Sequence, residues 1–160
     1  MSISDGLSHT PLHETHMVLG ARTAPFAGWD MPLQYSGILD EANSVRTSAG
    51  LFDVSHMGRL ELKGPDAAGL LDAVLSVSAP GMRRGRARYN LLCTEEGGII
   101  DDAIAYRRGD EEFLLIPNAG NTRVVLDWLA ANSKTHARVK IEDVTRQTAM
   151  IAHQGPRAAE

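Results

Sequence analysis

The chain has 160 residues, of which 43% are hydrophobic and 22% are charged, with a formal net charge of −4. These values match globular proteins and exclude intrinsic disorder, and no stretch approaches the roughly 20 apolar residues of a membrane-spanning helix. The modest charge gives no field that would recruit nucleic acid. The single cysteine, Cys93, excludes an internal disulfide, and residues 1–21 contain no Lys or Arg. We therefore expect a cytoplasmic protein without a secretory or mitochondrial leader.

Two helices are predicted in the first fifty residues. A Thr-Pro start and a glycine stop bound the first, at about 11–20, and apolar residues at helical spacing predict the second, at 37–50. The segment 25–32 lies between them and contains two prolines, a glycine, a Phe and a Trp. Such residues indicate a loop, which we expect the two aromatic side chains to anchor.

The remainder predicts strands with two further helices among them. Helices are expected at 66–76 and 121–131, and strands at 59–63, 89–93, 99–107, 112–116, 139–144 and 149–153. This order is typical of an α+β unit with helices on one face of an antiparallel sheet. The last residues, 154–160, resemble a turn and a helix start too short to form alone, so we expect a truncated chain.

Two consecutive carboxylates follow a Gly-Gly turn at the start of the strand 99–107. Because side chains alternate along a strand, Asp102 shares a face with Ile104 and Tyr106, whereas Asp101 lies opposite with Ala103. This alternation places Asp102 on the more apolar face. Burial there would raise the pKa of a carboxylate and suit a proton acceptor or an anchor for a polar ligand. The residue pattern alone favours the alternative, in which both aspartates end the turn in solvent.

Several segments occur in the order found in one known family. They are Phe-Ala-Gly-Trp-Asp-Met-Pro at 26–32, Gly-Leu-Phe-Asp-Val-Ser-His-Met-Gly at 50–58 and Gly-Gly-Ile-Ile-Asp-Asp at 97–102, with shorter matches at 10–12, 118–121 and 154–156. Together they resemble the T-proteins of the glycine cleavage system, from about residue 10 onward. Each motif is short, but the ordered set is specific.

The resemblance implies an aminomethyltransferase of the glycine cleavage system. Such an enzyme takes the one-carbon unit from the aminomethyl-dihydrolipoyl arm of the lipoylated H-protein, releases ammonia and transfers the carbon to tetrahydrofolate. Tetrahydrofolate is thus the implied co-substrate and the H-protein the implied partner, with no metal, nucleic acid or membrane involved.

The resemblance also implies a fold and its division into domains. An α+β ferredoxin-like unit at 52–141 would be inserted in a larger folate-binding first domain, to which 1–51 and 142–160 contribute. The chain would be the N-terminal portion of such an enzyme, and we expect it to be inactive alone.

The same resemblance implies the site residues. The family's catalytic aspartate aligns with Asp102, which would bond a folate ring nitrogen and ease proton movement. Tyr89, Ile104, Tyr106 and Asn118, together with Asp102, would bind folate. A tyrosine offers a flat apolar wall with a polar tip, although packing within the sheet is the ordinary role of a strand tyrosine.

Two related functions stay open. One is a non-catalytic folate-binding accessory protein of iron–sulfur assembly, and the other is a folate-dependent demethylase or the folate-binding domain of a sarcosine-type oxidase. Asp102 and the segment 53–58 favour the T-protein. No Gly-rich dinucleotide motif of a flavin domain follows a predicted strand.

The histidines and the basic segment carry no assigned chemistry. His9, His13 and His16 lack acidic or cysteine partners at ligand spacing in the sequence, so we expect them to be surface and interface residues; His56 has neither metal nor triad spacing. The arginines of the segment 83–88 favour a solvated loop. A dock for an acidic partner or a polyglutamate tail comes second, and nucleic acid last, because interleaved aromatic residues are missing.

Overall fold

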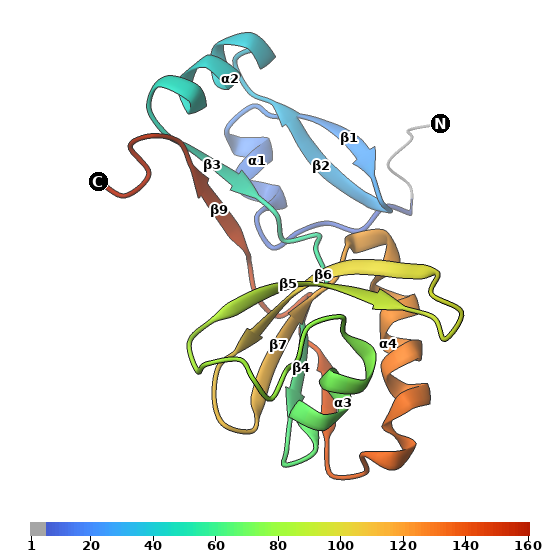
Figure 1. Cartoon of the computed structure of the whole chain (residues 1–160). Helices are drawn as coiled ribbons and strands as arrows, with labels where there is room; N and C mark the ends of the chain where they lie inside the picture. The colour runs from blue at the N-terminus through green and yellow to red at the C-terminus, as the bar shows by residue number, and fades with distance from the viewer. Residues whose placement is uncertain (1–5) are drawn as a thin grey trace. The chain divides into compact units, whose positions relative to one another are not determined.

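The computed structural model describes residues 6–160, which form two compact units (Figure 1). Unit 1 contains the chain up to His56 together with Arg146–Glu160, and unit 2 is the continuous segment Met57–Thr145. The chain therefore builds most of unit 1, then all of unit 2, and returns to unit 1. None of the helices within residues 6–160 has the length and apolar character needed to cross a membrane.

Unit 1 contains two short helices and two separate pairs of strands. Its elements are α1 (His13–Val18), β1 (Arg22–Phe26), β2 (Trp29–Gln34), α2 (Ile38–Thr47), β3 (Gly50–Asp53) and β9 (Ile151–Gln154). β1 pairs with β2, and β3 pairs with β9, both antiparallel.

The hairpin β1–β2 occupies the segment that the sequence predicted as a loop, so that prediction is wrong. Its two turn residues, Ala27 and Gly28, have φ values of +49° and +83°, as a two-residue type I′ turn requires. Prolines are tolerated because each strand of a two-stranded ribbon has one edge without a partner strand; on β2 that edge carries an isolated bridge between Ser8 and Trp29. Of the two expected aromatic anchors, Trp29 is buried whereas Phe26 is 59% exposed.

The pairing of β3 with β9 joins the two segments of unit 1. Its register runs from Gly50 opposite Gln154 to Asp53 opposite Ile151. Phe52, which the sequence placed at the start of the ferredoxin-like unit, pairs with Ala152 and therefore belongs to unit 1.

Unit 2 is a five-stranded antiparallel sheet with two helices on one face (Figure 1). Its elements are β4 (Leu60–Lys63), α3 (Ala67–Val74), β5 (Ala87–Cys93), β6 (Ile99–Arg107), β7 (Glu112–Ile116), α4 (Thr122–Asn132) and β8 (Lys140–Asp143), with 3₁₀ turns η1 (Ala119–Asn121) and η2 (Ser133–Thr135) flanking α4. The strand order is β5-β6-β7-β4-β8. β6 and β7 have the limits predicted from the sequence, and β8 lies within the predicted strand 139–144. β8 continues two residues beyond 141, where the sequence placed the end of the ferredoxin-like unit.

One apolar core holds unit 2 together. Alternate residues of β4, β6 and β7 meet the buried sides of α3 and α4 there, and the core includes Leu60, Leu62, Leu70, Leu71, Ala103, Ala105, Phe113, Leu115, Val125 and Leu129. Fully burying a side chain as large as Leu or Phe contributes about 1.5–3 kcal/mol to the free energy of folding. The opposite face of the sheet carries the other, alternating side chains of the strands, and these include Asp102, Ile104 and Tyr106.

A buried arginine links the two ends of unit 2. Arg59 is only 4% exposed, and its backbone N–H donates to Thr145 Oγ1 at 3.0 Å. Its guanidinium donates to the carbonyl oxygens of Met57, at 2.7 Å, and Thr145. The backbone N–H of Val144 donates to the Arg59 carbonyl at 2.9 Å. The first and last residues of the unit are thereby held together.

Candidate functional site

The predicted site residues gather on the helix-free face of the unit 2 sheet. In the antiparallel register, Tyr89 lies opposite Ile104, and Ile104 lies opposite Ile116. Asn118 lies two residues after Ile116, and Asp102 lies two residues before Ile104 on the antiparallel strand. Asn118 therefore lies beside Asp102. The strand alternation that the sequence predicted for Asp101 and Asp102 is therefore present.

The burial of the two aspartates is the reverse of the prediction. Asp101 is 3% exposed and lies with Ala103 and Ala105 on the helix-covered face, whereas Asp102 is partly exposed. The sequence interpretation equated large apolar side chains with burial. In the structure the covered face carries alanines, which leave room for α4, and the larger Ile104 and Tyr106 lie on the open face.

Asp101 is hydrogen-bonded through both of its carboxylate oxygens. Its carboxylate accepts bonds from the backbone N–H of Asn118 at 2.9 Å, from Asn118 Nδ2 at 2.9 Å and from Asn121 Nδ2 at 2.8 Å. These donors lie where the chain enters η1 and α4, and unpaired N–H groups at a helix start favour a negative charge. Asp101 therefore fastens the start of α4 to β6.

Asp102 has two partners and an open side. Tyr89 donates its hydroxyl to Asp102 Oδ2 at 2.6 Å, and Asn118 Nδ2 lies 3.0 Å from Oδ1. The hydrogen bond to Asp102, followed by burial and the charges of both aspartates, raises the pKa of Tyr89 above its ordinary value. Tyr89 is 63% exposed and Tyr106 40% exposed. The result is an oriented carboxylate beside two accessible phenol rings.

This arrangement suits a flat, polar-edged ligand. The rings of Tyr89 and Tyr106 and the side chain of Ile104 offer apolar surface, while Asp102 offers a hydrogen-bond acceptor at its edge. All five residues predicted to bind folate are thus close together in unit 2. Asn121 and the anchoring role of Asp101 were not predicted, because both depend on how η1 returns to β6.

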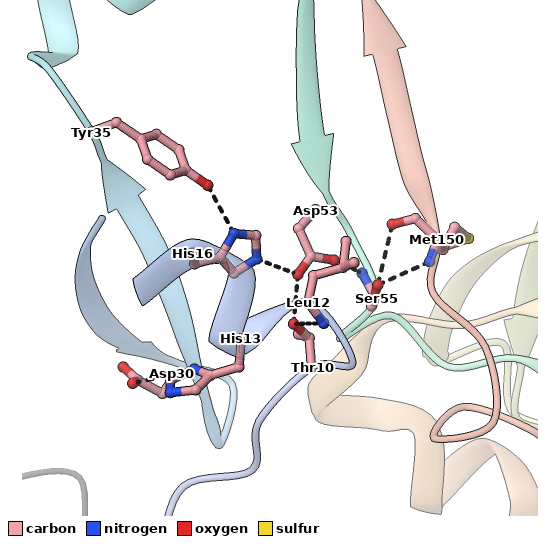
Figure 2. A network of polar contacts seen from close by, with 9 residues as sticks. All are labelled: Thr10, Leu12, His13, His16, Asp30, Tyr35, Asp53, Ser55 and Met150. Atoms are coloured by element: carbon pink, nitrogen blue, oxygen red, sulfur yellow. Dashed lines mark hydrogen bonds and ion pairs between the residues drawn. The ribbon is translucent and has the colours of Figure 1, made fainter. Parts of the chain in front are cut away.

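A second polar network lies inside unit 1, around Asp53 (Figure 2). Asp53 Oδ2 accepts a bond from Thr10 Oγ1 at 2.6 Å and lies 2.8 Å from His16 Nε2; Oδ1 accepts the backbone N–H of Ser55 at 2.8 Å. The hydroxyl of Tyr35 lies 2.9 Å from His16 Nδ1. The network connects α1, β3 and the end of β2.

The environment of Asp53 shifts two pKa values. Burial acts most strongly on Asp53 and raises its pKa, but the hydrogen bonds from His16, Ser55 and Thr10 together outweigh it, so the pKa lies below its ordinary value. Burial, then the charges of Asp53 and Glu41, raise the pKa of Tyr35. The expectation that His16 is a surface residue is wrong, since it is 6% exposed; only the fold brings it to Asp53.

The arginines of the segment 83–88 lie on the surface of unit 2. Every arginine of the segment 83–88 is exposed and makes no ion pair with any residue in the described part of the chain.

An open groove of about 960 Å³ lies in unit 1 beside β2, α2 and β3 and contains none of the predicted folate residues.

Comparison with known families decides the relationship. The family described as the GCVT N-terminal domain matches residues 12–160. The chain belongs to the GCVT N-terminal domain family. The order of motifs seen in the sequence thus reflects membership of this family, and the chain corresponds to the N-terminal portion of a T-protein.

Members of the GCVT family with curated names are similar along nearly the whole chain. Proteins named aminomethyltransferase from Corynebacterium jeikeium and Saccharopolyspora erythraea are each 48% identical, over 96% and 94% of this chain. The match covers 39% and 41% of those proteins, so the chain spans about two fifths of their length.

A solved member of the GCVT family has the same fold. The crystal structure of glycine cleavage system aminomethyltransferase T from Bartonella henselae superposes with a TM-score of 0.90 at 38% identity, over 96% of this chain and 42% of that chain.

Proposed function

We propose that this chain provides the folate-facing sheet of an aminomethyltransferase of the glycine cleavage system. The reaction transfers the one-carbon unit from the aminomethyl-dihydrolipoyl H-protein to tetrahydrofolate and releases ammonia. The observation that carries the proposal is the oriented carboxylate of Asp102 on the open sheet face, held by Tyr89 and Asn118 and flanked by Tyr106. The names of the similar proteins support the same reaction class.

In this proposal Asp102 acts on the folate ring. Its carboxylate accepts a hydrogen bond from the ring N–H that attacks the incoming carbon, and it takes the proton as the nitrogen–carbon bond forms. Tyr89 and Asn118 hold the carboxylate in one rotamer, so its orientation is set before the co-substrate binds. Tyr106 and Ile104 provide the apolar wall beside it.

The domain organisation that the family resemblance implies is part of the proposal. Without its edge strand β5, unit 2 has the order β6-β7-β4-β8 and the succession strand–helix–strand–strand–helix–strand, which supports a ferredoxin-like unit. Unit 1, made of two separated segments, would then be part of the folate-binding domain into which unit 2 is inserted.

The test uses a chimera, because the chain spans only two fifths of its relatives. The chain replaces the corresponding segment of the C. jeikeium aminomethyltransferase, and formation of methylenetetrahydrofolate from aminomethylated H-protein is measured. We expect activity in the chimera and a 10²–10⁴-fold lower turnover after Asp102→Asn, with a much smaller effect on tetrahydrofolate binding.

Two results would contradict the proposal. A chimera that binds tetrahydrofolate without transferring carbon would favour the non-catalytic accessory protein. Normal turnover in Asp102→Asn would remove Asp102 from the chemistry. Glu95→Gln, at the exposed turn before β6, serves as the matched control and should leave turnover unchanged.

A further inference from the structure

His9, His13 and Asp30 bring three metal-binding side chains together in unit 1. One ligand atom from each residue lies within 4.8 Å of the other two. His13 Nδ1 is 3.9 Å from Asp30 Oδ2, too far for a hydrogen bond, and the two side chains are only 12% and 11% exposed. Figure 2 shows the two side by side, on α1 and β2. The aminomethyltransferase proposal assigns this cluster no role.

Backbone hydrogen bonds hold the three residues in place. The N–H of Ser8 donates to the Gly28 carbonyl and the N–H of Asp30 donates to the Ser8 carbonyl, both at 2.9 Å, so His9 lies next to Asp30. The N–H of His13 donates to the Thr10 carbonyl at 3.1 Å, and the Thr10 side chain is itself bound to Asp53. The ligands therefore come from backbone that is already fixed.

One buried nitrogen of this cluster is unsatisfied. His13 Nδ1 is buried and has no hydrogen-bond partner among residues 6–160. Leaving such an atom unpaired is costly, and buried polar atoms are seldom left so. The adjacent cation, Arg146, is directed elsewhere: its guanidinium lies over the Trp29 ring and donates to Ser8 Oγ at 2.7 Å.

The donor set is that of a transition-metal site. Two imidazole nitrogens and one carboxylate oxygen, with water as the fourth ligand, bind Zn²⁺ at about 2.0–2.2 Å, which places nitrogen and oxygen about 3.4 Å apart. The observed 3.9 Å is close to that value. The His9 and His13 rings are stacked, 3.7 Å apart and within 7° of parallel, so one must turn before both lone pairs meet at one ion. His9 is exposed and free to turn.

We propose that His9, His13 and Asp30 bind one divalent transition-metal cation, with Zn²⁺ as the physiological choice. The ion would connect the segment before α1 to β2 and so stabilise unit 1 by mass action. Imidazole and carboxylate ligands together favour Zn²⁺ and its Irving–Williams neighbours over Mg²⁺ or Ca²⁺, which prefer oxygen alone.

The test is a zinc titration of the tag-free chain in competition with a chromogenic chelator. We expect one Zn²⁺ per chain, a Zn²⁺-dependent rise in the unfolding temperature and no competition by a large excess of Mg²⁺. His9→Ala changes an exposed side chain and should weaken binding at least about tenfold, as should Asp30→Asn. His153→Ala, an exposed histidine on β9, is the matched control and should bind as the wild type does.

Co²⁺ provides a second readout at the same residues. A site with four nitrogen and oxygen ligands should give an intense visible absorption band that disappears in His9→Ala. If wild type and His9→Ala bind Zn²⁺ equally, or if His153→Ala is the variant that weakens binding, the proposal is wrong. Unfolding of Asp30→Asn would not obscure the result, because His9→Ala removes an exposed side chain and no buried one.

Discussion

Asp101 and Asp102 are neighbours in sequence, yet their carboxylates have different surroundings. Asp101 is buried and accepts three hydrogen bonds from Asn118 and Asn121. Asp102 shares Asn118 but keeps a partly exposed side toward Tyr89. Asn118 therefore positions Asp102 while it fastens Asp101, and a change at Asn118 should disturb both.

Asp101→Asn should destabilise the chain more than Asp102→Asn. An amide in place of the buried carboxylate keeps one acceptor oxygen but points its NH2 group at a donor that the other carboxylate oxygen had accepted. This leaves a buried donor unpaired and costs about 1–3 kcal/mol. Asp102→Asn keeps an acceptor for Tyr89 and should cost less than about 1 kcal/mol. Urea unfolding followed by circular dichroism measures both; equal midpoints would contradict the separation of roles.

The residues that the family resemblance named lie close together in the structure, but the sequence did not predict the surroundings of the two aspartates. Strand alternation separates Asp101 from Asp102 without any tertiary information. Burial does not follow from alternation, because it depends on which face α3 and α4 cover, and the alanines on that face gave no apolar signal. His16 and Asp53 were missed for a similar reason, since their contact needs α1 and β3 to be placed.

Asp53 should make unit 1 sensitive to acid. Because hydrogen bonds lower its folded pKa despite burial, the unfolded state binds the proton more readily. The stabilisation is complete above the unfolded pKa of about 4 and is lost as the pH falls through the folded value. From about pH 5 to about pH 3, the wild type should lose more free energy of unfolding than Asp53→Asn. The same pH dependence of the free energy of unfolding in the wild type and Asp53→Asn would refute this. Asp40→Asn, a change at an exposed residue of α2, is the control and should show the pH dependence of the wild type.

At the scale of elements, Gly64 allows β4 to end beside the segment that leads into β8. Its φ is +129°, and a Cβ there would overlap the carbonyl oxygen of Arg138. Gly64→Ala should therefore lower the free energy of unfolding by about 2–4 kcal/mol through backbone strain and overlap. Gly120→Ala is the matched control, because nothing lies within 4 Å of its added Cβ. Thermal unfolding compares them, and similar transition temperatures would disprove the expectation.

Elements with local signals were predictable, and those defined by distant partners were not. β6 and β7 have alternating residues bounded by turns, and their limits agree with the sequence prediction. The hairpin β1–β2 was missed because Pro25 and Pro32 argue against strands and Ala27 is an uncommon residue at positive φ. β3 has four residues whose only pairing partner among the described strands is β9, so no local pattern marks it.

At the scale of the molecule, if the exposed arginines of the segment 83–88 dock the acidic H-protein of the proposed reaction, they should speed its encounter with the enzyme. Reversing Arg83, Arg84 and Arg86 to Glu in the chimera should slow association roughly tenfold or more at low salt and much less at high salt. Stopped-flow association at several ionic strengths measures this.

A matched control carries the same charge change elsewhere. Reversal of Arg22, Arg123 and Lys134, which lie outside the segment, should slow association less. If both triple variants slow equally, only the total charge matters; if neither does, the segment is a solvated loop.

The closing of unit 1 by β9 has a consequence for synthesis on the ribosome. β3 leaves the exit tunnel long before β9, and at about 5–20 residues per second the delay for the roughly 100 intervening residues is about 5–20 s. During that interval Leu51 and Phe52 have no partner strand. Unit 2 is continuous, but Arg59 links its start to Thr145, so the unit is complete only when its last residues emerge, shortly before β9. The nascent chain therefore exposes β3 without its partner strand while unit 2 is synthesised, which is a defined period in which a chaperone can bind it.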